Sequence, residues 1–191
     1  MPDSDPGTEP DPDDAKPFRI RDERDEDHDA VREVHQAAFP GPEEAELVDR
    51  LRLEARPIIS LVAERRDDAR VIGHVLCSSV TIVDPSDGDR MLDSRLRFGL
   101  APVGVLPAEQ GVGAGSALVR AAVARCRELG AMGVVLLGDP GYYARFGFVA
   151  ASTFGLVYEP VGEHPAFQAL ELVPGGFEPG SVKYHPAFDQ V

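Results

Sequence analysis

Lysine is nearly absent from this chain of 191 residues, whose only two lysines are Lys16 and Lys183. Asp and Glu number 33 against 19 Lys and Arg, so the formal net charge is −14. Proteins that bind nucleic acid need many cationic side chains to displace counterions from phosphates, so nucleic acid is not expected as a partner. The acidity is compatible with attraction of a cationic substrate such as an amine, although a merely solvated acidic surface is the more common case.

Cysteine and long apolar runs are also scarce. Cys77 and Cys126 both lie in apolar runs, which predicts buried free thiols. Neither belongs to a CxxC pair, and the five histidines lack the spacing of metal ligands, so no metal site is expected. The sequence contains no secretory signal and no apolar run long enough to span a bilayer. We therefore expect a cytoplasmic protein with no membrane partner.

The chain divides into two parts by composition. Residues 1–17 are rich in Asp and Pro and almost free of apolar residues, so they are predicted to form a disordered acidic tail. Residues 18–191 contain most of the apolar residues, which make up 43% of the whole chain. This part is predicted to be a single domain.

Hydrophobic periodicity predicts an α/β fold. Expected strands cover 18–22, 58–66, 70–83, 95–107, 132–138, 146–152 and 167–173. Expected helices cover 25–39, 43–53 and 113–130, with a further short helix that begins at Pro140 and is capped by Asp139. Residues 85–90 are expected to be a loop. Because a helix connects strands 95–107 and 132–138, these two strands should be parallel neighbours in an otherwise mostly antiparallel sheet.

The segment EQGVGAGSAL, residues 109–118, lies between a predicted strand and a predicted helix. It does not match a dinucleotide fingerprint, since Ser116 stands where the third glycine is needed, and it lacks the lysine of a Walker A loop. Its glycines would still let a ligand approach the backbone, and the first amides of a helix are free donors that suit a pyrophosphate. A glycine-rich helix entry without any ligand is the alternative.

Two motifs carry a resemblance to a known family. Gln110-x-x-Gly113-x-Gly115 follows a strand that ends Val-x-Pro, and GDPGYYARFGF at 138–148 contains a Tyr-x-x-x-Gly-Phe pattern that begins at Tyr143. Together they closely resemble the GNAT superfamily of N-acyltransferases, and VIGHVLCSSVTI, LAPVGVLP and VKYHPAF resemble its YhbS-like bacterial branch. The resemblance covers nearly all of residues 18–191. It implies the GNAT fold, with a mixed sheet of about seven strands, about four flanking helices, and a fourth and fifth strand that splay apart.

The resemblance also implies where acetyl-CoA would bind. The pantetheine arm would lie between strands 95–107 and 132–138, against the backbone of Val103, Gly104 and Val105, with the Val105 amide as donor to the thioester oxygen. Pro102 independently favours a local break in pairing, although it could simply bend the strand. The pyrophosphate would be held by the loop and helix start, namely Gln110, Gly111, Val112, Gly113, Ala114, Gly115 and Ser116.

The implied reaction is direct attack of an amine on the acetyl thioester. Tyr143 matches the family's acid, which would protonate the departing thiolate; a packed aromatic residue is the alternative. Tyr142 is expected to pack or to line the site. Arg145 is expected either near a cofactor phosphate or in solvent.

The acceptor side is less defined by the sequence. His74 is the candidate base, although a histidine on a strand more often has a structural role. On the second helix, Glu43, Glu44 and Glu46 could bind a cationic substrate, with a solvated charged face as the alternative. Water could relay the amine proton, so no protein base is required. A Cys77–His74 acyl-enzyme is rejected, because residues three apart on a strand point to opposite faces.

The sequence therefore predicts an acetyl-CoA-dependent N-acetyltransferase that acts on a primary amine of a small molecule or a protein. The alternative is a catalytically silent acyl-CoA sensor or accessory module on the same fold. A homodimer is compatible with the resemblance. Nothing in the sequence identifies the acceptor amine or the acyl-chain length.

Overall fold

The computed structural model describes residues 16–190. Most of the predicted acidic tail therefore lies outside the described residues. Its last two residues are described, and their carbonyls accept hydrogen bonds from Arg66: Lys16 from the side-chain Nε at 3.2 Å and Pro17 from the backbone amide at 2.9 Å. Regular backbone pairing thus begins just before the first strand.

A seven-stranded sheet forms the centre of the molecule, in the order β1-β2-β3-β6-β7-β10-β8. Its members are β1 (Phe18–Asp22), β2 (Ile58–Arg65), β3 (Val71–Ser79), β6 (Arg97–Val105), β7 (Gly133–Leu137), β8 (Val149–Ala150) and β10 (Phe167–Glu171). Only β6 and β7 pair in parallel, and every other neighbouring pair is antiparallel. The predicted mixed, mostly antiparallel sheet with one β-α-β crossover is confirmed.

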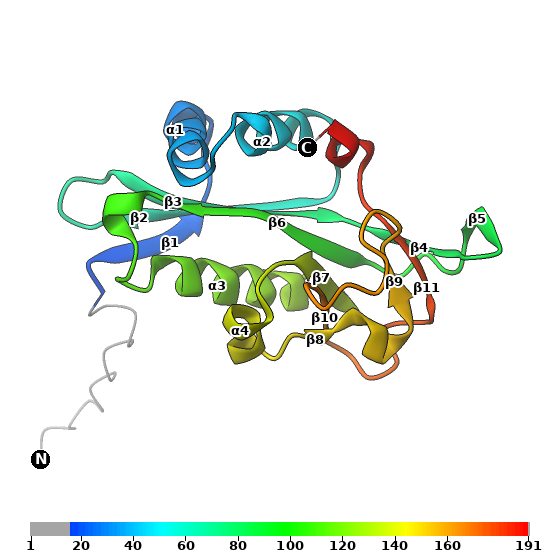
Figure 1. Ribbon diagram of the computed structural model, residues 1–191. Helices are drawn as coiled ribbons and strands as arrows, with labels where there is room; N and C mark the ends of the chain where they lie inside the picture. The colour runs from blue at the N-terminus through cyan, green and yellow to red at the C-terminus, as the bar shows by residue number, and fades with distance from the viewer. Residues whose placement is uncertain (1–15, 191) are drawn as a thin grey trace, which may run out of the picture.

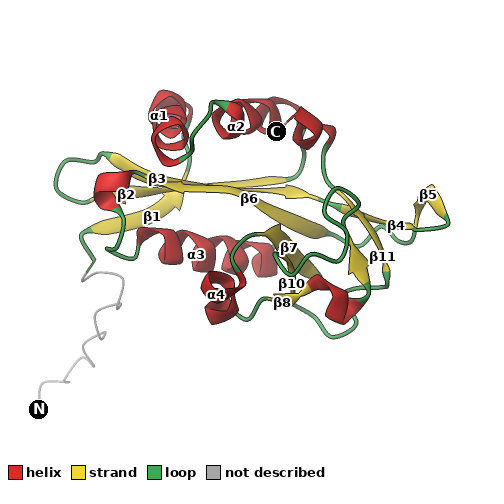
Figure 2. Cartoon of the chain, viewed as in Figure 1, coloured by secondary structure: helices red, strands yellow, loops and turns green. Residues whose placement is uncertain are grey.

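Four α-helices cover the two faces of this sheet. Helices α1 (His28–Ala38) and α2 (Glu43–Glu54) lie on one face, together with the C-terminal 3₁₀ helix η5 (Pro186–Gln190), whereas α3 (Ala114–Glu128) and the short α4 (Pro140–Tyr143) lie on the other (Figures 1 and 2). Burial of one stripe of each helix accounts for this packing. The buried stripe of α3 includes Leu118, Ala122 and Cys126, and the Asp139 side chain caps α4 by accepting from the Gly141 amide at 2.9 Å.

A second, four-stranded sheet was not predicted. Its order is β5 (Asp87–Met91), β4 (Thr81–Asp84), β11 (Gly180–Lys183) and β9 (Leu156–Val157). The strand expected at 70–83 is divided at Val80, beyond which the chain leaves β3 and pairs with β11 instead. The loop expected at 85–90 is mostly β5, which forms a hairpin with β4. Pairing with strands far away in the sequence decides both cases, so the local sequence pattern could not predict either one.

The two parallel strands separate along their length, as expected. They pair only where Arg97, Phe98 and Gly99 face Gly133, Val134 and Val135. Beyond Gly99, β6 keeps its neighbour β3 alone. The β3–β6 register also shifts between Val75 and Cys77, opposite the part of β6 that contains Pro102. A bulge at this proline fits its missing amide donor and leaves one edge of β6 open.

Candidate active site

The open edge of β6 presents backbone donors and acceptors. The Leu106 amide donates to the Ile72 carbonyl at 2.9 Å, and hydrogen-bonded pairs alternate along an antiparallel ladder. The amide and carbonyl of Gly104 therefore point toward β3, while those of Val103 and Val105 point toward the side that β7 has left. This edge can accept an extended chain as an additional strand.

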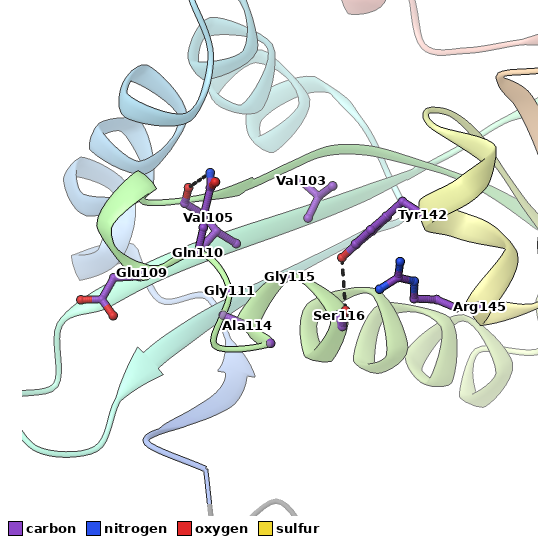
Figure 3. A pocket seen from close by; sticks show the side chains of 11 residues that line it. Val103, Val105, Glu109, Gln110, Gly111, Ala114, Gly115, Ser116, Tyr142 and Arg145 are labelled. Atoms are coloured by element: carbon purple, nitrogen blue, oxygen red, sulfur yellow. Dashed lines mark hydrogen bonds between the residues drawn. The ribbon is translucent and has the colours of Figure 1, made fainter.

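A cavity of about 510 Å³ lies at this edge and extends to the start of α3 (Figure 3). Gly111 and Gly113 have φ values of 84° and 91°, a left-handed conformation that favours glycine. No side chain caps α3 and its first turn holds no acidic residue, so its first amides are free to bind an anion. The Gln110 side chain closes the loop by donating to the Val105 carbonyl at 3.3 Å.

The structure brings together most of the residues predicted to bind the cofactor. Those that line this cavity are Val103, Val105, Gln110, Gly111, Gly113, Ala114, Gly115 and Ser116. Two predicted residues do not line it. At Gly104 the position of an added Cβ would face α1, 3.1 Å from Nδ1 of His35. Val112 is 48% exposed to solvent. Glu109 also lines the cavity, although sequence reasoning did not select it, and its carboxylate accepts from Arg65 at 3.3 Å.

Tyr142 and Arg145 form the far wall of the same cavity (Figure 3). The Tyr142 hydroxyl lies 3.4 Å from the Ser116 hydroxyl, and the Arg145 guanidinium lies over the Tyr142 ring at 4.7 Å. Arg145 also lines an adjoining cavity with Arg120 and Arg127 of α3. None of these three arginines has an acidic partner within residues 16–190. Sequence reasoning did not select the two helix arginines and therefore missed this cationic cluster.

Tyr143, the next residue of α4, faces a different cavity from Tyr142. It is buried and lines a second cavity of about 350 Å³. Burial, together with the neighbouring Tyr142, raises the pKa of its phenol to about 12, so the hydroxyl keeps its proton at neutral pH. Val103 is the residue that both large cavities share. The two cavities therefore meet beside the open edge of β6.

Of the candidate acceptor residues, only Glu44 lines the second cavity. Glu43 is exposed, and the Glu46 carboxylate accepts from Arg50 at 3.3 Å. The rest of the lining is apolar or aromatic and comes from widely separated segments: Phe39, Leu47, Leu100, Ala101, Pro102, Val103, Leu137, Tyr143, Tyr158, Tyr184 and Phe188. Apart from Tyr143, sequence reasoning missed the aromatic residues of this set.

His74 does not line the second cavity, contrary to its candidate role. Its ring is fully buried, with Nδ1 2.8 Å from Nε2 of His35 and Nε2 2.8 Å from the Ser60 hydroxyl. Ser60 donates its proton to Glu23, so His74 must donate from Nε2 and accept at Nδ1 from His35. Burial lowers the pKa of both imidazoles, that of His35 to about 4, and both rings are neutral. The candidate base is thus part of a structural polar network.

Cys77 faces α3 rather than His74. Its thiol is buried beside Cys126, which with burial raises its pKa well above the ordinary value. A thiol in this state is a poor nucleophile, which agrees with the rejection of a Cys77–His74 acyl-enzyme. Across residues 16–190, no cluster of three His, Cys, Asp or Glu side chains could hold a metal ion. In the same range, no helix is long and apolar enough to cross a membrane.

A family model described as "Acetyltransferase (GNAT) family" matches residues 28–148. The chain belongs to the GNAT family. This GNAT chain is 38% identical over 133 residues to "Uncharacterized N-acetyltransferase YjhQ" of Escherichia coli K12, covering 69% of this chain and 68% of that protein. It is 33% identical over 155 residues to "Uncharacterized N-acetyltransferase YhbS" of the same strain, covering 80% and 87%. The predicted family and its YhbS-like branch are confirmed.

Two solved GNAT structures resemble most of this chain. One is a GNAT family acetyltransferase from Brucella melitensis in complex with acetyl-CoA, with a TM-score of 0.70, 40% identity, and coverage of 90% of this chain and 98% of that one. The other is Escherichia coli YhbS in complex with CoA, with a TM-score of 0.79, 32% identity, and coverage of 96% of both chains. The predicted GNAT fold is therefore confirmed.

Proposed function

We propose that this GNAT protein transfers an acetyl group from acetyl-CoA to a primary amine by direct attack. The observation that carries the proposal is the meeting of two cavities at Val103. One cavity offers free backbone amides, and the other holds a buried, protonated Tyr143. A donor and an acceptor that enter from opposite sides would therefore meet at the open edge of β6.

The first cavity suits acetyl-CoA. The pyrophosphate would accept hydrogen bonds from amides between Gly111 and Ser116, at the positive end of α3. The pantetheine arm would pair with the backbone of Val103 and Val105 as an additional strand. The arginine cluster of Arg120, Arg127 and Arg145 offers cationic partners for the 3′-phosphate of coenzyme A. Similar GNAT proteins solved with acetyl-CoA or CoA support this assignment.

The acetyl group would lie where the two cavities join. Val103 lines both cavities, whereas Val105 lines only the first cavity. We therefore propose that the Val103 amide, rather than the Val105 amide predicted from the sequence, donates to the thioester oxygen. The Val105 backbone is then a partner for the pantetheine arm. An amide donor fixed in a strand needs no reorganisation during the reaction, which favours stabilisation of the developing charge.

The steps follow from these positions. A neutral amine attacks the thioester carbonyl carbon, the C–N bond forms, and the carbonyl oxygen gains negative charge that the Val103 amide stabilises. The C–S bond then breaks, and Tyr143 donates its proton to the departing thiolate of CoA. The amine nitrogen releases its extra proton to water, and Tyr143 regains a proton from solvent. Because burial keeps the pKa of Tyr143 near 12, the phenol is protonated when the thiolate leaves.

Release of free thiol from acetyl-CoA across a panel of amines tests this function, with Tyr143→Phe as the variant and Tyr142→Phe as its matched control. A positioned acid contributes roughly 10²–10⁴-fold to rate, so Tyr143→Phe should lower kcat by about a hundredfold or more. Tyr142→Phe should keep kcat within a few-fold, since the Tyr142 hydroxyl lies beside Ser116 in the first cavity, which would hold acetyl-CoA and is called the donor cavity below. Equal rates for wild type and Tyr143→Phe would remove Tyr143 as the acid. Tight acetyl-CoA binding without turnover on any amine would favour the silent-sensor alternative.

A further inference from the structure

The second cavity, which would receive the acceptor and is called the acceptor cavity below, is lined almost entirely by apolar and aromatic side chains. Besides Tyr143, four aromatic residues line it, and Glu44 is its only charged side chain. A polyhydroxylated or anionic acceptor would lose water-mediated partners here and find few replacements. The cavity therefore selects acceptors by apolar surface and by positive charge.

The aromatic wall is built mainly from the C-terminal part of the chain. The Tyr184 ring lies 5.0 Å from that of Tyr158 and 4.9 Å from that of Phe188, measured between centroids. Phe39, at the end of α1, lines the cavity from another element and stacks on His35 at 5.8 Å. These contacts hold the rings in fixed positions, so a flat apolar ligand would find a preformed surface.

Within residues 16–190, Glu44 is the half-buried acidic residue of α2 that no cation neutralises, whereas Glu43 and Glu54 are exposed to solvent. Asp49 contacts both Arg32 and Arg52, and Glu46 accepts from Arg50. Glu44 is half-buried among apolar side chains and has no cationic partner within residues 16–190. A carboxylate in such a place is stabilised by a ligand cation, and aromatic faces attract the same charge.

We propose that the acceptor is a primary amine on a compact aromatic or apolar body that carries no carboxylate, and that Glu44 binds its ammonium group as it enters. This inference rests on the proposed function, because it concerns the acceptor of that reaction. The ammonium loses its proton to water before the neutral amine attacks the thioester. An amino acid is disfavoured because its own carboxylate would face Glu44 without a cation to neutralise it.

Binding to the CoA-saturated protein, measured by calorimetry, tests the inference with three probes: 2-phenylethylamine, L-phenylalanine and D-glucosamine. We expect 2-phenylethylamine to bind at least tenfold more tightly than either other probe. Glu44→Gln should weaken its binding at least tenfold, whereas Glu43→Gln, an exposed neighbour outside the cavity, should change it less than twofold. Phe188→Leu should weaken it more than Phe154→Leu, whose ring packs against Phe177 and does not line the cavity.

Several results would overturn the inference. Equal binding of the three probes to the wild-type protein would by itself contradict it. An unchanged affinity in a folded Glu44→Gln protein would remove the carboxylate from recognition. Displacement of 2-phenylethylamine by octanoyl-CoA, with tighter binding of octanoyl-CoA than of acetyl-CoA, would assign the cavity to a long acyl chain instead.

A turnover assay with the same probes and acetyl-CoA separates the two proposals. If 2-phenylethylamine binds with the expected dependence on Glu44 but none of the three probes is acetylated, recognition of the ammonium by Glu44 holds and the proposed function fails. If D-glucosamine or L-phenylalanine is acetylated faster, the proposed function holds and the acceptor inference fails.

Discussion

Gly113→Val, compared with Gly130→Val, isolates the contribution of the glycine loop to cofactor binding. Both glycines have left-handed backbones, with φ values of 91° and 74°, and an added Cβ at either would meet no protein atom within 4 Å. A left-handed conformation costs an L-residue roughly 1–2 kcal/mol. Both variants should therefore lose similar stability, about 2–8 °C in Tm for a chain of this size. Only Gly113 lines the donor cavity.

The assay is thermal unfolding with and without acetyl-CoA. A ligand at a concentration of about 100 times Kd stabilises the native state by about 2.7 kcal/mol, which corresponds to a rise in Tm of roughly 5–10 °C. Wild type and Gly130→Val should show this rise. The valine at position 113 would occupy the space above the first amides of α3, and a hundredfold loss of affinity would leave a rise of less than about 2 °C. A full rise in Gly113→Val would refute the phosphate-binding loop.

Two further predictions concern charge. Arg127→Gln should weaken binding of CoA by roughly three- to tenfold but leave binding of dephospho-CoA unchanged. Arg125→Gln, on the same helix but paired with Asp22, should change the binding of neither ligand. An equal effect of Arg127→Gln on both ligands would contradict a 3′-phosphate site. The lowered pKa values of His35 and His74 mean that their contribution to stability is present above pH 6.5 and is lost as pH falls toward 4, since the unfolded chain binds protons that the native rings do not. In urea unfolding, stability should fall by up to about 1.4 kcal/mol per pH unit for each histidine once the pH is well below 6.5, as between pH 6 and 5, and His35→Gln should reduce that slope. A flat profile would show that the native rings are protonated.

Sequence pattern predicted the centre of the fold better than its edges. The crossover from β6 through α3 to β7 was predicted because each element has a strong local period and a turn signal at its ends. The second sheet was missed, since β9 has two residues and β11 has four, and their pairing partners lie far away in the sequence. The division of 70–83 at Val80 depends on the same long-range pairing.

The site shows the same contrast. The loop around Gly113 and the proposed acid Tyr143 lie in contiguous motifs, so a resemblance could identify both. Phe39, Tyr158 and Phe188 come from three distant segments and carry no shared pattern, so only the folded chain reveals that they line one cavity. Helical periodicity likewise did not distinguish the cavity-facing Glu44 from its exposed neighbour Glu43.

A crystal structure of this protein with acetyl-CoA tests the central claim most directly. The account predicts the pyrophosphate on the amides of residues 111–116, the pantetheine arm between β6 and β7, and the thioester oxygen within about 3.1 Å of the Val103 amide. The Tyr143 hydroxyl should lie within hydrogen-bonding reach of the sulfur. An acetyl group that faces away from Tyr143, or a pyrophosphate held elsewhere than at the start of α3, would contradict the account.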